Sequence, residues 1–156
     1  MPMEQFQIQF YVPDSEWKKA NVHRYGAGVQ PVVDLFYGDV AISVDSHPLL
    51  DSPYNMSVAD LASQLAALLL EGFPTRRSKG LFRQLDDSLE IDFAVEGEDV
   101  IMSTGGRTLT VGRAAFVEGV TSFILEFARE AQRRVPEALK WKDLTAVQEF
   151  LATAVA

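Results

Sequence analysis

A period of two runs through residues 89–96, where apolar side chains alternate with acidic or small ones. The apolar set consists of Leu89, Ile91, Phe93 and Val95. Successive side chains of a strand point to opposite faces, so this pattern predicts a strand with one buried and one wet face, as in an antiparallel sheet. Two further strands are predicted around 100–102 and 108–111, and the Gly105-Gly106 pair between them suits a two-residue hairpin turn.

After Gly112 the period changes to steps of three and four residues, which is the spacing of one face of a helix. The apolar positions are Phe116, Val120, Phe123, Ile124, Phe127 and Ala131. Pro136 ends the pattern, because proline cannot continue the backbone ladder of a helix. The sequence therefore predicts a helix of about 22 residues and about 33 Å, long enough to cross one face of a sheet.

Three more strands are predicted from runs of alternating, aromatic or β-branched residues. They cover 6–10, 32–37 and 40–45, the last two joined by a hairpin or bulge at Gly38-Asp39. The proline-containing segment 46–55 is predicted as an irregular loop, and 73–84 as a polar connection.

Further helices are predicted where apolar residues recur at helical spacing. One covers 57–72, with Ser57 as its N-cap and Gly72 at its end. The others are a final helix at 140–156 and a short one at 15–20.

This order of elements segregates strands from helices and favours an α+β fold. We expect one domain over residues 1–156, with a single, mostly antiparallel sheet of about five or six strands and two or three helices packed on one face. In outline the order resembles that of many small bacterial α+β proteins, among them toxin-immunity proteins. The resemblance covers no specific motif and transfers no functional residue.

Composition excludes several classes of site. The 156-residue chain is 47% apolar, which is enough for a core without metals or disulfides. It contains no cysteine, which excludes disulfides, thiolate metal sites and a cysteine nucleophile, and fits a cytoplasmic location. Its first residues lack the pattern of a signal peptide, and its most apolar window, 61–70, is too short to cross a bilayer. We expect no membrane association.

Charge is unevenly distributed along the chain. The net charge of −8 disfavours nucleic-acid binding, which needs clustered cations. Seven carboxylates lie between Arg83 and Asp99, namely Asp86, Asp87, Glu90, Asp92, Glu96, Glu98 and Asp99. A basic stretch precedes them and consists of Arg76, Arg77, Lys79 and Arg83. Such asymmetry could steer an oppositely charged partner, and the plainer alternative is a solvated surface.

The polar residues offer one weak constellation. His23 and His47 lie in predicted loops without the spacing of metal ligands, and Asp34 sits inside an apolar run. These three form a candidate polar site, with exposed loop histidines and an edge-strand aspartate as the alternative. The chain lacks a G-x-S-x-G elbow and a phosphate-binding loop, so we predict no catalytic residue, no metal and no cofactor.

A contact surface is predicted from aromatic and basic residues in or beside loops, because such side chains are common at interfaces. The candidates are Trp17, Tyr25, Tyr54, Arg76, Arg77 and Trp141.

Three functional hypotheses follow. The first is a non-catalytic protein-binding module of an inhibitory, immunity-type or regulatory kind. The second is a small-ligand or enzymatic domain whose pocket between sheet and helices uses Asp34, His23 or His47. The third is a homo-oligomer, such as a homodimer, that buries an apolar surface against its own copy.

Overall fold

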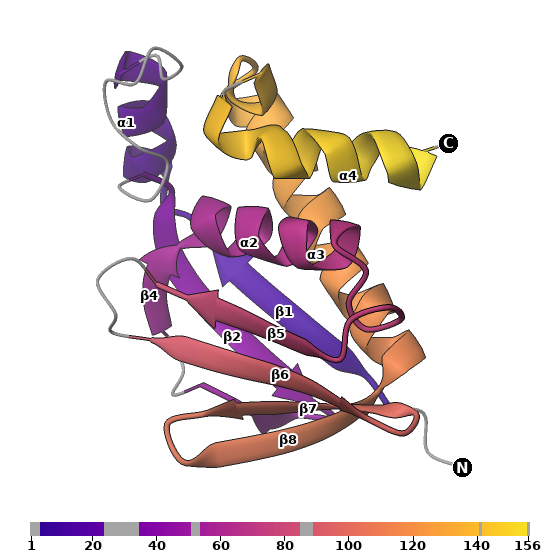
Figure 1. The fold of residues 1–156 in the computed structure, drawn as a ribbon. Coiled ribbons are helices and arrows are strands. Elements are labelled where there is room, and N and C mark those ends of the chain that lie inside the picture. Colours follow the sequence, from indigo (N-terminus) through magenta and orange to yellow (C-terminus); the bar gives the residue numbers. More distant parts are fainter. Residues whose placement is uncertain (1–3, 24–34, 51–53, 85–88, 141, 156) are drawn as a thin grey trace.

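The computed structural model describes residues 4–23, 35–50, 54–84, 89–140 and 142–155 (Figure 1). Within these residues the chain forms two four-stranded antiparallel sheets and four α-helices. Among them, no helix combines the length and the apolar character needed to cross a membrane.

The first sheet is built around β2, which pairs with β1 on one side and with β3 and β4 on the other. Its strands are β1 (Phe6–Tyr11), β2 (Tyr37–Val44), β3 (His47–Pro48) and β4 (Tyr54–Ser57). The buried side chains of β1 and β2 face each other, with Ile8 opposite Ile42. The segment predicted as an irregular loop thus contributes β3 and the start of β4.

The predicted break at Gly38-Asp39 is wrong, because β2 runs straight through both residues. Gly38 serves a close approach instead. A Cβ at this position would overlap the backbone carbonyl of Tyr11, where the chain leaves β1. Glycine permits both a turn and a tight crossing, and the sequence does not distinguish them. The predicted strand at 32–37 lies mostly outside the described residues.

The second sheet is a meander in the order β5-β6-β7-β8. Its strands are β5 (Lys79–Arg83), β6 (Glu90–Glu96), β7 (Asp99–Thr104) and β8 (Arg107–Gly112). The hairpin at Gly105-Gly106 is confirmed, with φ of 53° and 81° and Thr104 opposite Arg107. Strand β5 lies in the segment predicted as a polar connection, so that prediction is wrong for residues 79–83. The strand was not predicted because it has a single buried residue, Phe82, which is too weak a pattern.

The helices match the predicted pattern more closely. They are α1 (Asp14–His23), α2 (Val58–Leu70), α3 (Arg113–Arg134) and α4 (Thr145–Val155). The long helix has the predicted 22 residues. The Ser57 hydroxyl accepts a hydrogen bond from the Asp60 amide at 3.2 Å, which confirms the N-cap of α2. The last helix begins later than predicted, after the short 3₁₀ turns η2 (Ala138–Lys140) and η3 (Lys142–Leu144).

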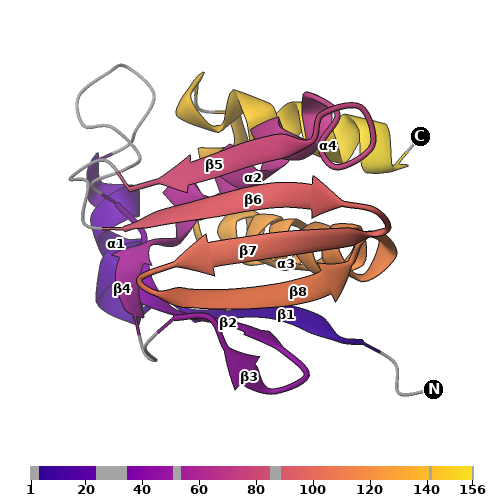
Figure 2. The ribbon, with the colours of Figure 1, turned by 60° about the horizontal axis from the view of Figure 1, so that its bottom comes forward.

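The α+β class is confirmed, but the single sheet is wrong, as is the number of helices. Helix α2 carries the chain out of the first sheet before β5 begins the second. Figure 2 shows the β5–β8 sheet from its outer side, with α2 and α3 behind it. Local alternation predicts individual strands, whereas their division between two sheets depends on pairing far along the chain.

Both sheets and the helices share one hydrophobic core. Phe116 of α3 lies at its centre, fully buried. Its ring centroid is 5.4 Å from that of Phe6 in the first sheet and 5.6 Å from that of Phe93 in the second. It is also 5.6 Å from the ring of Phe73, which follows α2. One side chain therefore joins four parts of the chain.

Asp60, in the first turn of α2, gives a testable pH dependence. Burial raises the pKa of Asp60, and a hydrogen bond from Gln64 at 3.1 Å acts in the opposite direction. The folded chain thus binds a proton here at pH values where the unfolded chain has lost it. This contribution to the free energy of unfolding falls as pH rises from the ordinary pKa through the raised one.

An Asp60→Asn variant should lose this dependence. We expect the difference in unfolding free energy, variant minus wild type, to grow between about pH 3 and pH 7 in urea titrations. Asp14, whose pKa the Arg134 guanidinium lowers, titrates in both proteins and cancels in the difference. A difference that stays constant over this range contradicts the assignment.

Candidate functional site

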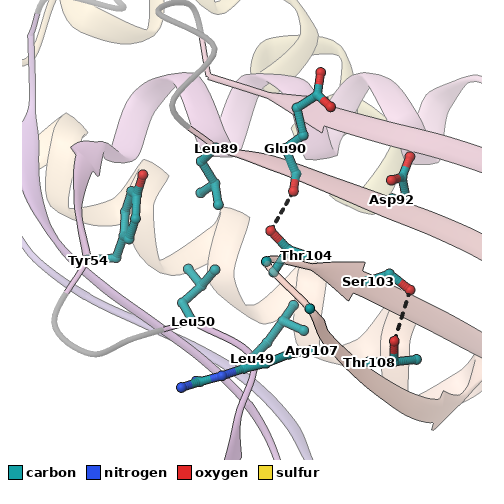
Figure 3. A pocket seen from close by; sticks show the side chains of 12 residues that line it. Leu49, Leu50, Tyr54, Leu89, Glu90, Asp92, Ser103, Thr104, Arg107 and Thr108 are labelled. Carbon is teal, nitrogen blue, oxygen red and sulfur yellow. Dashed lines mark hydrogen bonds between the residues drawn. The ribbon is translucent and has the colours of Figure 1, made fainter.

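An open cleft of about 640 Å³ lies between the β3–β4 side of the first sheet and the ends of β6, β7 and β8. Figure 3 shows Leu49, Leu50 and Leu89 on its apolar side. Leu49 and Leu50 are only 1% and 3% exposed, so they offer little open surface. The exposed lining of the cleft is polar and apolar in nearly equal parts.

The polar groups of the cleft largely satisfy one another. The Thr104 hydroxyl donates to the backbone carbonyl of Glu90 at 2.5 Å (Figure 3). The hydroxyls of Ser103 and Thr108 are 3.4 Å apart. The Glu90 carboxylate accepts from Arg83 Nε at 2.5 Å. Across the described ranges no three His, Cys, Asp or Glu side chains group closely enough to hold a metal ion.

A second candidate feature is strand β5, which pairs with β6 and lies opposite Glu90. This strand pairs with β6 alone and forms one end of its sheet (Figure 2). Two backbone bonds bracket the ladder, from Val95 N to Ser78 O at 2.8 Å and from Gln84 N to Leu89 O at 2.9 Å. Hydrogen-bonded pairs alternate along an antiparallel ladder, so every second residue from Ser78 to Gln84 bonds to β6.

The residues in between direct their N–H and C=O groups away from the sheet. They are Lys79, Leu81 and Arg83, and we call their outward backbone the β5 edge. Helix α2 closes one end of it, because Gln64 binds both backbone groups of Arg83. Arg83 N donates to Gln64 Oε1 at 3.2 Å, and Gln64 Nε2 donates to Arg83 O at 2.8 Å.

The remaining part of the β5 edge is open. Leu81 is 43% exposed, an unusual exposure for a leucine of this chain, and Lys79 is also exposed. Within the described part of the chain, neither residue's backbone has a hydrogen bond on this side. An open edge of this kind is a template for pairing with another chain.

Four cations lie in strand β5 or just before it along the chain, namely Arg76, Arg77, Lys79 and Arg83. Arg77 pairs with Glu71 at 3.0 Å, and Arg83 pairs with Glu90. Arg76 and Lys79 have no ion pair among the residues that the structure describes. The predicted basic stretch is therefore made of the turn that follows α2 and of strand β5 itself.

The edge of β1, at the far side of the first sheet, has a helix packed against it. Helix α3 crosses it at Gly119, where a Cβ would overlap both the carbonyl oxygen and the ring of Phe6. A hollow of about 510 Å³ remains between β1 and α3, lined by polar side chains such as Gln7 and Glu118 and by apolar ones such as Phe123. Covering an edge with a helix blocks its pairing with other chains.

The structure separates the predicted contact residues. Arg76 and Arg77 are exposed in the turn that precedes β5, and Tyr54 lines the cleft, half buried. Trp17 lies inside α1 rather than in a loop and is 4% exposed. Its ring packs 5.4 Å from that of Phe36 and carries the Arg134 guanidinium at 5.7 Å. Trp17 is thus a core residue and offers no contact surface.

Most of the candidate polar site lies outside the described residues. His47 is exposed in β3, opposite Val44. His23 ends α1, and its side chain lies outside the described part, as do Asp34, Tyr25 and Trp141.

Sequence reasoning missed Leu81 and Gln64. The available signal was a short alternation in the sequence. Lys79, Leu81 and Arg83 share one strand face, so that Leu81 lies between two cations, while Phe82 lies on the buried face. A comparison with protein families finds no match, and no curated protein and no solved structure matches the chain.

Proposed function

We propose that this chain is a non-catalytic protein-binding module that receives an extended segment of a partner protein as an additional strand beside β5. One observation carries the proposal: Lys79 and Leu81 present outward backbone groups at an exposed sheet edge, and no other described residue hydrogen-bonds to these groups. Strand addition is an established mode of recognition in which main-chain hydrogen bonds give affinity and alternate side chains give specificity.

The energetics suit a modest, reversible interaction. Lys79 and Leu81 each offer one N–H and one C=O, and each new hydrogen bond contributes about 0.5–1.5 kcal/mol net. Covering the exposed part of Leu81 adds an apolar contribution. The remaining free energy must come from side chains along the segment, so affinity depends on the partner's sequence.

The test is a selection of random peptides of about ten residues, displayed on phage, against the full chain. Enriched peptides should bind Leu81→Pro more weakly than Leu81→Ala. Both variants lose the leucine side chain, but only proline removes the outward N–H, and this N–H makes no bond within its own sheet. One lost hydrogen bond corresponds to about a three- to tenfold weaker Kd.

The cleft supplies the contrasting variant, Tyr54→Ala. Enriched peptides should bind it as they bind the wild type, and binding should slow hydrogen exchange at the Leu81 amide. Peptides that depend on Tyr54 and tolerate Leu81→Pro contradict the proposal, and so does an unchanged exchange rate at Leu81.

A further inference from the structure

We infer that the segment received by β5 carries an apolar residue flanked, two positions away on each side, by acidic residues. This inference rests on the proposed function and names the chemistry of its partner. It follows from which face of the sheet each side chain of the β5 edge occupies.

Lys79, Leu81 and Arg83 alternate along the strand, so their side chains share the outer face of the sheet. Because Leu81 directs both backbone groups outward, one partner residue faces it as a directly hydrogen-bonded pair. The partner residue two positions away on one side faces Lys79. The one two positions away on the other side lies near Arg83, at the end of the edge that Gln64 closes. An apolar side chain opposite Leu81 and carboxylates opposite the two cations are therefore the complementary set.

Strand β6 shows this complementarity at one of the three positions on the other side of β5, whereas opposite Leu81 it places Asp92. It places Glu90 opposite Arg83 and forms the 2.5 Å ion pair with it. Opposite Lys79 it places Ala94, so this lysine has no carboxylate across the ladder. The acidic residue that faces Lys79 should therefore contribute more than the one that faces Arg83, whose charge is paired and whose backbone Gln64 occupies.

A second copy of the chain does not fit the same edge. Two β5 strands paired antiparallel about Leu81 would set each Lys79 against the Arg83 of the other copy. Like charges directly opposite each other destabilise a strand pair. The charge pattern therefore selects an acidic segment of a different protein.

The test uses three synthetic peptides, Thr-Glu-Thr-Val-Thr-Glu-Thr and its versions with both glutamates replaced by glutamine or by lysine. Their Kd values for the full chain are measured by isothermal titration calorimetry at low and high salt. The glutamate peptide should bind most tightly and the lysine peptide most weakly, with about a five- to tenfold span at low salt that narrows at high salt.

Charge reversal on the protein gives the matched control. Lys79→Glu should invert the order of the glutamate and lysine peptides, whereas Lys142→Glu, the same change of charge on η3, should preserve it. Three peptides that bind equally but lose affinity on Leu81→Pro overturn the acidic preference and leave the proposed function intact. Peptides that bind without dependence on Leu81, or not at all, overturn both. Self-association abolished by Leu81→Asp in sedimentation would make a second copy the occupant and overturn the inference.

Discussion

Replacing Phe116 by alanine is expected to lower the free energy of unfolding by about 3–5 kcal/mol, the cost typical of removing a buried phenylalanine. The ring contacts Phe6, Phe73 and Phe93 and is fully buried. Because its neighbours come from both sheets and from the segment after α2, they cannot all collapse into the space it leaves. The cavity contribution should therefore add to the lost burial.

Urea denaturation followed by circular dichroism measures this loss. Tyr11→Ala is the matched control, since Tyr11 is an aromatic residue that is 65% exposed. Its effect should stay within about 0.5 kcal/mol. A loss below about 1 kcal/mol for Phe116→Ala would show that the four parts of the chain do not meet at this ring.

The second large effect is expected from Gly119→Ala. Alanine in place of glycine normally stabilises a helix by up to about 1 kcal/mol. Here the added Cβ would overlap the carbonyl oxygen and ring of Phe6. Overpacking of this kind typically costs about 1–3 kcal/mol, so it outweighs the helical gain and the variant should be less stable.

The control for Gly119→Ala is Glu118→Ala, which changes the adjacent, exposed residue of the same helix. Thermal unfolding of the two variants separates the close crossing from helix propensity. If Gly119→Ala raised the melting temperature, α3 could not lie against the β1 backbone as described.

The sequence predicted the elements whose signals are local. The alternation around Ile91, the helical stripe through Phe116 and the turn at Gly105-Gly106 depend on neighbours a few residues apart. The division into two sheets was not predictable in this way. It depends on the strands before α2 pairing with one another and not with the strands after it, and no local pattern in the sequence determines this.

The candidate site was predicted in part. The charges of Arg76, Arg77 and Lys79 are evident in the sequence, but their position beside an open edge is not. An edge is open or closed according to residues from elsewhere in the chain, such as the Gln64 side chain at Arg83 or the backbone of Gly119 at Phe6. The burial of Trp17 was not predicted from the sequence. The helix that contains it, α1, has a weak sequence signal, and the Trp17 ring is buried by Phe36 and Phe127 from other parts of the chain.

The short length of β5 affects how readily the protein aggregates in a concentrated solution. An unpaired strand attracts any extended chain, including misfolded ones, and so favours fibrils. Here the exposed portion is confined to a five-residue strand whose far end is occupied by an amide from α2. Growth by repeated stacking needs a longer template, so a five-residue strand that is closed at one end is a poor nucleus for aggregation.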